Sequence, residues 1–333
     1  MKNWIAVAIW TASLIPAHAW TSLSKNSCLT LRGPNGAIDA HLTSVRISTK
    51  LRDTDRRDVL ATMATAMAYS IGSFSCSKSV NALDIGSVND NQKYSLKFPT
   101  LFAPLYGEAS RKTIKRSVGE GIFVLEQNLE LGPLQTPLRC TVIRLKNGTL
   151  WVHAPLAPTQ EFFEMVESCG ESVAHVIAPT YALEHKVFVK DALQRWPDAQ
   201  LWTSPNQFSF PFAVSNEFIF GKDVSGVLTS SFTSSTSQEK PSWTDEIEYA
   251  SLEGGTFNIG GKSTTLCETA FFHKESKSLI VTDAVARIST SVPPLNDPEK
   301  LLLISKRSTS DPMPEDTPQS RLDGWEKTVS KSA

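Results

Sequence analysis

The chain has 333 residues, 41% of them hydrophobic, and its 33 Lys and Arg nearly balance 34 Asp and Glu for a formal net charge of −1. The charge is unevenly distributed, because residues 1–82 carry nine basic and four acidic residues and residues 83–333 carry the other 24 and 30. An acidic body lacks the clustered Lys and Arg that a phosphate backbone requires, so we exclude nucleic acid as the main partner. Residues 83–333 are enough for one domain with a full core.

Residues 1–19 have the pattern of a secretory signal peptide. Lys2 precedes an apolar stretch over residues 4–15, and the small-residue motif Ala17-His18-Ala19 marks a cleavage site. The stretch is shorter than the ~20 residues that span a bilayer as a helix. We therefore predict cleavage after Ala19, with a retained membrane anchor as the alternative.

Residues 20–55 are rich in Ser and Thr and carry several basic residues but few acids, which is the composition of a transit peptide. Trp20 directly follows the cleavage site. This junction resembles the bipartite plastid-targeting presequences of algae with secondary plastids, most of which have Phe there. The resemblance implies import into a plastid (chloroplast).

Residues 56–82 form a third targeting signal. Arg56-Arg57 precede the weakly apolar residues 59–74, and Val80-Asn81-Ala82 is a second small-residue motif, an order that resembles a twin-arginine lumenal signal. An amphipathic helix within the folded domain is the alternative. Together the three signals predict a mature chain that begins near Leu83 in the thylakoid lumen, with the stroma as the alternative compartment.

Beyond this leader, we predict an irregular lead-in over residues 83–119 and a folded domain over residues 120–304. Short runs rich in β-branched and aromatic residues predict strands at 121–131, 138–145, 149–156, 173–179, 200–205 and 246–255, and two strands within 268–285 that are joined by a turn at residues 273–276. Asn147-Gly148 predicts a hairpin turn. One helix is predicted over residues 157–171, with Thr159 as its N-cap, and another over residues 186–199, ended by Pro197.

The order hairpin, helix, strand, helix, strand predicts an α/β layered domain. No segment of the mature part is apolar over a length that suits a membrane span. The polar, Pro-containing residues 305–333 are predicted to form a loosely ordered tail. Cys140, Cys169 and Cys267 are widely spaced and form no CxxC pair, so we predict buried small apolar residues rather than a disulfide framework or a zinc site.

Four histidines lie in the mature part, and none belongs to an HxH or HExxH motif. We predict that His153, His175 and His273 are ordinary packed or solvated residues. His185 differs because it lies with Glu184 in the loop between a predicted strand and a predicted helix, where metal and catalytic sites are common. The sequence therefore directs attention to this loop.

The loop "APTYALEHKVF" and the later strand end "LIVTDAV" resemble the metallo-β-lactamase-like hydrolases, in which a THxHxDH loop and a bridging Asp surround two metal positions. On this pattern Thr180 and Ala182 stand where two histidine ligands would be, so the resemblance implies that one metal position is lost. It implies four candidate ligands for the other position: Glu184, His185, Asp283 and Glu268. Such a set suits one divalent ion (zinc, iron or manganese), and a protein without a metal is the alternative.

A closer resemblance, to the plastid and cyanobacterial domain-of-unknown-function family 4336, is carried by "LEHKVFV", "PDAQLWTSPNQFSFP", "DEIEYASL" and "ETAFFHKESKSLIVTDAV". It spans residues 120–325 and implies a four-layer, metallo-β-lactamase-like αββα sandwich with a degenerate metal site. It implies no reaction. Members of that family continue past Gly324-Trp325 into more apolar sequence, whereas this chain ends at Ala333, so a sandwich that is incomplete at the C-terminus is the alternative.

Two functions agree with these patterns. The first is a mononuclear metal-dependent hydrolase, in which the ion lowers the pKa of a bound water to make the nucleophile. The alternative is a non-catalytic binding or assembly protein of the photosynthetic compartment that kept the fold and lost the site. Its partner would be an unknown small molecule or a photosynthetic protein, contacted through aromatic residues predicted to be exposed: Trp202, Phe208, Phe210 and Phe212.

Overall fold

The structure, a computed structural model, describes residues 90–95, 110–131, 133–207, 219–229, 240–259, 262–285 and 289–332, together with four two-residue strands in the leader. Those strands pair as β1 (Cys28–Leu29) with β4 (Leu42–Thr43) and as β2 (Arg32–Gly33) with β3 (Gly36–Ala37). The three predicted targeting signals otherwise lie outside the described residues. The chain divides into two compact units, and all that follows concerns the larger one, which holds residues 84–254 and 258–333.

A seven-stranded sheet forms the centre of this unit, in the order β11-β10-β9-β8-β7-β6-β5. Neighbours from β5 to β8 are antiparallel, and those from β8 to β11 are parallel. The strands are β5 (Ile114–Gly119), β6 (Ile122–Leu131), β7 (Leu134–Arg144), β8 (Leu150–His153), β9 (Val173–Ala178), β10 (Gln200–Thr203) and β11 (Gly226–Val227).

Local sequence explains the connections. Gly148 has φ +86, which the turn between β7 and β8 requires and which glycine adopts without strain. Thr159 caps helix α3 (Gln160–Glu167) by accepting a 3.1 Å hydrogen bond from the Phe162 amide. Helix α4 (Val189–Arg195) ends two residues before Pro197. The predicted turn, N-cap and both helices are confirmed.

Two apolar layers lie on opposite faces of the seven-stranded sheet because side chains alternate along each strand. On one face Val152 packs with Phe162 and Val166 of α3 and with Val189 of α4. The other face packs on a three-stranded sheet of β12 (Ile247–Ile259), β13 (Lys262–His273) and β14 (Ser278–Ile280). The residues that join the two sheets include Trp151, Trp202, Trp243, Phe271 and Ile280.

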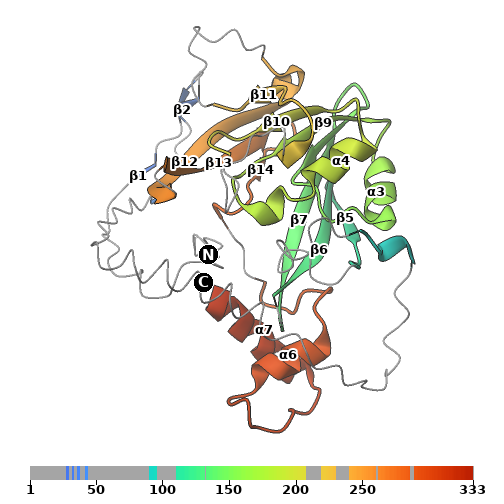
Figure 1. Cartoon of the computed structure of the whole chain (residues 1–333), viewed down its shortest axis with the longest axis vertical. Helices are drawn as coiled ribbons and strands as arrows, with labels where there is room; N and C mark the ends of the chain where they lie inside the picture. Colours follow the sequence, from blue (N-terminus) through green and yellow to red (C-terminus); the bar gives the residue numbers. More distant parts are fainter. Residues whose placement is uncertain are drawn as a thin grey trace. The chain divides into compact units, whose positions relative to one another are not determined.

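The expected α/β layered fold is therefore confirmed, with helices, a large sheet and a small sheet stacked in that order (Figure 1). These are three of the four expected layers, as seen in the part of the chain that the structure describes.

Trp202 is only 4% exposed, so the prediction that it contacts a partner is wrong. Phe208, Phe210 and Phe212 lie outside the described residues. Cys140, Cys169 and Cys267 are free and buried, as predicted.

The prediction of a loosely ordered tail is wrong for most of its length. Helix α7 (Pro318–Ser332) packs on α6 (Pro298–Ser305), and α6 also contacts β7 (Figure 1). The packing is close, because a Cβ on Gly324 would clash with the carbonyl oxygen of Leu301. Trp325 is 6% exposed and donates from Nε1 to the Ser289 carbonyl, at 2.9 Å.

The lead-in also departs from the prediction, since β5 is a regular edge strand rather than irregular chain. Four of its six residues are exposed, so it lacks the apolar pattern by which the inner strands are recognised. Short 3-10 turns complete the described elements: η2 (Asp90–Gln92), η3 (Leu183–His185) and η4 (Ser242–Asp245). None of the helices among these residues has the length and apolar character needed to cross a membrane.

Candidate functional site

The loop after β9 and the loop after β14 meet at one edge of the two sheets. Thr180, two residues past the end of β9, forms an antiparallel bridge with Glu268 on β13. The Thr269 amide next to it donates to the Pro179 carbonyl at 2.7 Å. The edge is the one at which the parallel strands end, and in open α/β sheets ligands bind there.

His185 and Asp283 come together at this edge. The ring Nε2 of His185 lies 3.1 Å from Asp283 Oδ1, although 98 positions separate the two residues in the chain. The His185 side chain is 8% exposed and that of Asp283 is 23% exposed. Burial alone would lower the pKa of His185, but the Asp283 carboxylate, and beyond it Glu184 and Glu268, raise that pKa to about 9. His185 is therefore charged at neutral pH.

Glu268 bonds to the backbone of the second loop. Its Oε1 accepts from the Thr282 amide at 2.7 Å, and its Oε2 accepts from the amides of Asp283 and Ala284 at 2.8 Å each. Burial raises the pKa of Glu268. Both oxygens are thus engaged by backbone N–H groups, a role different from the predicted one of fourth metal ligand.

His153, which ends β8, lies within electrostatic reach of His185. It is 2% exposed, with its ring stacked on Trp151 at 5.6 Å and edge-on to Phe271 at 5.5 Å between centroids. Neither ring nitrogen has a hydrogen-bond partner among the described residues, and the same holds for Nδ1 of His185. Burial, and then the charge of His185, lower the pKa of His153 to about 3. The prediction of a packed histidine is confirmed, but its place beside His185 was missed.

Lys186, the residue after His185, is buried and was also missed. It is 1% exposed, and its Nζ donates to Gln207 Oε1 at 3.1 Å. Gln207 in turn donates to Ser204 Oγ at 2.7 Å and to the Thr180 carbonyl at 3.2 Å. Burial lowers the pKa of Lys186 to about 7.

Three of the four predicted metal ligands are already engaged in other contacts. Within the described ranges, no group of three or more His, Cys, Asp or Glu side chains is arranged to hold a metal ion. His185 Nε2 bonds to Asp283 Oδ1, and both Glu268 oxygens bond to backbone amides. Glu184 affects His185 through its charge. In this arrangement the four predicted ligands do not fit a divalent ion, and we derive no chemistry through one.

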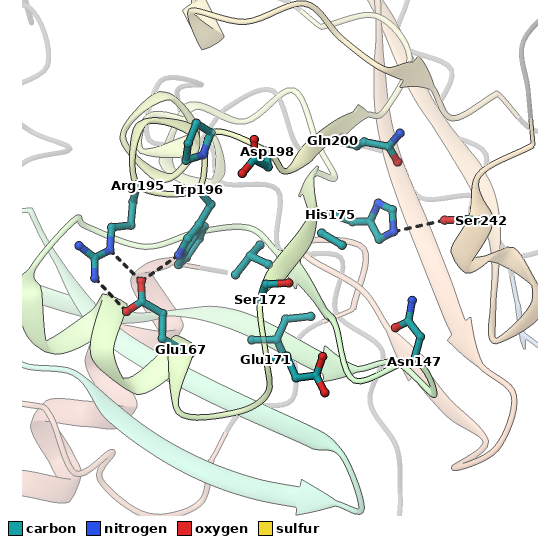
Figure 2. Close-up of a pocket in the computed structure, with 14 residues that line it drawn as sticks. Asn147, Glu167, Glu171, Ser172, His175, Arg195, Trp196, Asp198, Gln200 and Ser242 are labelled. Carbon is teal, nitrogen blue, oxygen red and sulfur yellow. Dashed lines mark hydrogen bonds and ion pairs between the residues drawn. The ribbon is translucent and has the colours of Figure 1, made fainter.

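A hollow of about 660 Å³ opens at the opposite, amino end of β9 and β10 (Figure 2). On one side of it Arg195 Nε donates to Glu167 Oε1 at 2.7 Å, and Trp196 Nε1 donates to the same oxygen at 3.0 Å. Its other lining residues include Asn147, Glu171, Ser172, His175, Asp198, Gln200 and Ser242. This hollow and the His185–Asp283 pair are therefore at opposite ends of the same strands.

His175, at the amino end, is held as a neutral imidazole. Trp202 Nε1 lies 3.3 Å from His175 Nδ1, and Ser242 Oγ lies 3.4 Å from His175 Nε2. Because an indole N–H can only donate, Nδ1 is the acceptor and Nε2 carries the proton. Burial lowers the pKa of His175 to about 4. His175 therefore cannot take a proton from Ser242 through Nε2, and the two do not form a nucleophile–base pair.

His273 has a structural role. Its Nδ1 lies 2.8 Å from Ser276 Oγ and accepts from the Ser276 amide at 3.4 Å, which holds the turn between β13 and β14. The predictions for His175 and His273 as ordinary packed residues are confirmed, since both are at most 5% exposed. Among the described residues, His153 and His185 are the histidines with buried ring nitrogens that lack a hydrogen-bond partner.

Comparisons with known proteins give a family but no activity. A solved structure, "Metallo-beta-lactamase from Pontibacter korlensis", is 12% identical and gives a TM-score of 0.31 over 50% of this chain and 70% of that chain, which we note as a similarity only. No curated protein matches the sequence. The family model "Domain of unknown function (DUF4336)" matches residues 119–332, well over half of the 333 residues. The chain therefore belongs to the DUF4336 family.

Proposed function

We propose that this domain binds a polar small molecule at the carboxyl edge of its parallel strands and uses His185, paired with Asp283, to donate a hydrogen bond or a proton to it. The single observation that carries the proposal is the 3.1 Å contact between His185 Nε2 and Asp283 Oδ1. It joins two loops from different sheets at the edge where ligands bind in such folds. No resident metal is part of this proposal.

A purely structural role explains the pair less well. Burying two charges costs desolvation energy that their attraction often fails to recover, so such a pair is a weak device for stability. Asp283 also keeps 23% of its side chain exposed, so the pair is reachable from solvent on that side. Strand-end loops on a rigid sheet commonly carry functional residues. The position of the pair at the strand ends, the desolvation energy that its burial costs and the exposure of Asp283 together favour a functional site.

The chemistry follows from the donors on the ring. A charged imidazole has two N–H groups, and here Nε2–H is directed at Asp283 while Nδ1 has no partner in the described residues. Asp283 orients the ring and stabilises its charge, as an acid does behind a catalytic histidine. Nδ1–H is buried in this structure, so it donates to an oxygen atom of the ligand where ligand binding uncovers this side of the ring. Tyr181, whose pKa is raised by burial and by Asp283, lies close enough to line the same edge.

A substrate screen with variants tests this proposal. The purified full chain would be assayed against panels of carboxylic and phosphate esters and lactones, and by thermal shift against a metabolite library. We expect at least one turnover or binding signal, reduced about 100-fold or more in His185→Gln and Asp283→Asn. Asp198→Asn, at the opposite edge, is the matched control and should retain the signal. A signal that survives both site variants would exclude the site.

A mononuclear metal hydrolase is the second candidate, and one observation favours it. Three buried imidazole nitrogens, two on His153 and one on His185, lack hydrogen-bond partners in the described structure. Zinc, iron or manganese could engage such atoms only after His185 and Asp283 rearrange. Metal analysis after loading decides between the candidates: near-stoichiometric metal that is lost in His185→Gln supports the second, and less than about a tenth of an equivalent supports the first.

The cellular location belongs to the same proposal. The three consecutive targeting patterns in residues 1–82 support import into a plastid and delivery to the thylakoid lumen, with the stroma as the alternative. A fluorescent protein fused after residue 82 tests this. We expect lumenal fluorescence for the native leader and stromal fluorescence for the Arg56→Lys, Arg57→Lys leader. Fluorescence outside the plastid would contradict the proposal and would also remove a photosynthetic protein as partner.

A further inference from the structure

We propose that Glu268 is the positioning residue that assembles the His185–Asp283 pair, an inference that rests on the proposed function of that pair. Glu268 contacts both loops, through its backbone on one side and through its side chain on the other. It is 8% exposed. A carboxylate thus holds together two loops that the resemblance to metallo-hydrolases would join through a metal.

The backbone of Glu268 fixes the loop that carries His185. Residue 268 bridges Thr180, and the following amide, that of Thr269, donates to Pro179 at 2.7 Å. These contacts lie five and six residues before His185, at the start of its loop. The single-turn helix η3 (Leu183–His185) then carries the imidazole toward the edge, so the path of the loop depends on its attachment to β13.

The side chain of Glu268 fixes the loop that carries Asp283. Three consecutive amides, of residues 282, 283 and 284, converge on its two oxygens at 2.7 to 2.8 Å. Hydrogen bonds to an ionised acceptor are shorter and stronger than neutral ones. The middle amide belongs to Asp283 itself, so the clamp sets the direction from which that side chain reaches His185.

Only a carboxylate satisfies this set of donors. A glutamine at position 268 has one acceptor oxygen and one NH₂ group, so at least one of the three backbone N–H groups would face another donor. The substitution keeps the length and volume of the side chain and leaves the Thr180 bridge in place. Glu268→Gln is therefore a selective way to release the Asp283 loop.

Glu246, the residue just before β12 of the small sheet, provides a matched control. Both of its carboxylate oxygens accept from the Lys146 amide, at 3.2 and 3.0 Å, and its carbonyl accepts from the Lys274 amide at 3.0 Å. It is thus also a glutamate that bonds a loop amide, but its hydrogen bonds among the described residues do not reach either member of the pair. Glu246→Gln measures the general effect of removing such a carboxylate.

The experiment is amide hydrogen exchange together with ¹⁵N spectra of the histidine side chains, on the full chain. In Glu268→Gln we expect exchange of the amides of residues 282 to 284 to rise about 10-fold or more. We also expect the His185 ring resonances to move toward those of an unpaired imidazole, a change that a general loss of stability does not produce. Glu246→Gln should leave both unchanged. Unaltered His185 resonances in Glu268→Gln would overturn the proposal.

A measurement on the native chain covers the case in which Glu268→Gln does not fold. Protection of the three amides should be the same with EDTA and with added zinc chloride, because the clamp needs no metal. Faster exchange on adding zinc would mean that Glu268 leaves the amides for the ion, and would overturn the proposal. The failure of one proposal can be distinguished from the failure of the other. The ligand or turnover signal of Asp283→Asn tests the proposed function, and the His185 ring resonances of Glu268→Gln test the positioning role.

Discussion

One histidine lies near each end of strand β9, and the two differ in charge. At the carboxyl end His185 is paired with Asp283 at 3.1 Å, and its pKa is raised to about 9. At the amino end His175 lies between the indole of Trp202 and the hydroxyl of Ser242, and its pKa is lowered to about 4. Both rings are buried. Burial favours the neutral form of both rings, and at His185 the Asp283 carboxylate outweighs it.

The hollow and the charged imidazole lie at different ends of the strands. The amino end has the hollow of about 660 Å³, but its Ser242–His175 contact leaves the histidine without a lone pair toward the hydroxyl. The carboxyl end has a charged, carboxylate-oriented imidazole. We give more weight to the carboxyl end, because a site is identified by groups that can act on a ligand rather than by volume.

Removing Asp283 should produce the largest difference between the two ends. Asp283→Asn leaves a buried imidazole without its carboxylate, and we expect a loss of about 3 kcal/mol in the free energy of unfolding at pH 7, limited because His185 can release its proton. Asp198→Asn, an exposed carboxylate at the amino end, should change stability by less than about 0.5 kcal/mol. Urea denaturation measures both. Equal effects of the two variants would mean that the two ends do not differ as described.

The pH dependence of stability sharpens the picture at the carboxyl end. The pKa of His185 is raised from 6.5 to about 9, so its stabilisation is complete below pH 6.5 and is lost as pH rises through 9. The pKa of Lys186 is lowered from 10.5 to about 7, so its destabilisation is complete below pH 7 and is relieved as pH rises toward 10.5. Between pH 7 and 9 the two effects oppose each other, so the free energy of unfolding should be nearly independent of pH.

Single substitutions should separate the two opposing pH dependences of the free energy of unfolding. His185→Gln should become more stable by roughly 2 kcal/mol between pH 7 and 9, because only the lysine effect remains. Lys186→Met should become less stable by a similar amount over the same range. The double variant should be flat again. Thermal or urea unfolding at pH 7, 8 and 9 gives the slopes, and parallel curves for the two single variants would contradict the assignment.

The amino end should respond at acid pH instead. The pKa of His175 is lowered from 6.5 to about 4, so the neutral ring contributes stability that is complete above pH 6.5 and is lost as pH falls toward 4. Replacing it by Gln should reduce the acid-induced loss between pH 6.5 and 4 by about 1.5 kcal/mol. The His185→Gln variant should leave this range unchanged, since His185 is charged in both the folded and unfolded states there. Urea denaturation at four pH values tests this.

The elements that the sequence predicted well are those whose apolar pattern is strong. The buried strands β8, β9 and β10 and the capped helix α3 follow directly from continuous apolar runs and from Thr159. β5 was missed because most of its side chains are exposed at the sheet edge. Helix α7 was missed because only a few residues of a polar segment, such as Trp325 and Thr328, are buried against the rest of the domain.

The candidate site could be predicted only in part. The meeting of His185 with Asp283 was expected from the resemblance to the metallo-β-lactamase-like hydrolases, which puts Asp283 at the position of the bridging Asp. The role of Glu268 could not be read from the sequence, since backbone amides that bond to a carboxylate leave no residue signature. The place of His153 depends on the register of β8 against β9, which pairs it with Ile177 and which a pattern of apolar residues does not determine.

The smallest effect is expected for Ser242→Ala, and it tests the tautomer of His175. If Trp202 fixes the proton on Nε2, the serine only accepts a weak 3.4 Å hydrogen bond, and its loss should cost about 0.5 kcal/mol at pH 7. The ¹⁵N spectrum of His175 should keep the same tautomer in the variant, because the Trp202 donor remains 3.3 Å from Nδ1. Trp202→Phe is the informative comparison, since removal of that donor frees the ring to exchange tautomers. A tautomer change in Ser242→Ala alone would show that the serine sets the proton position, and the amino end would then have a histidine able to act as a base.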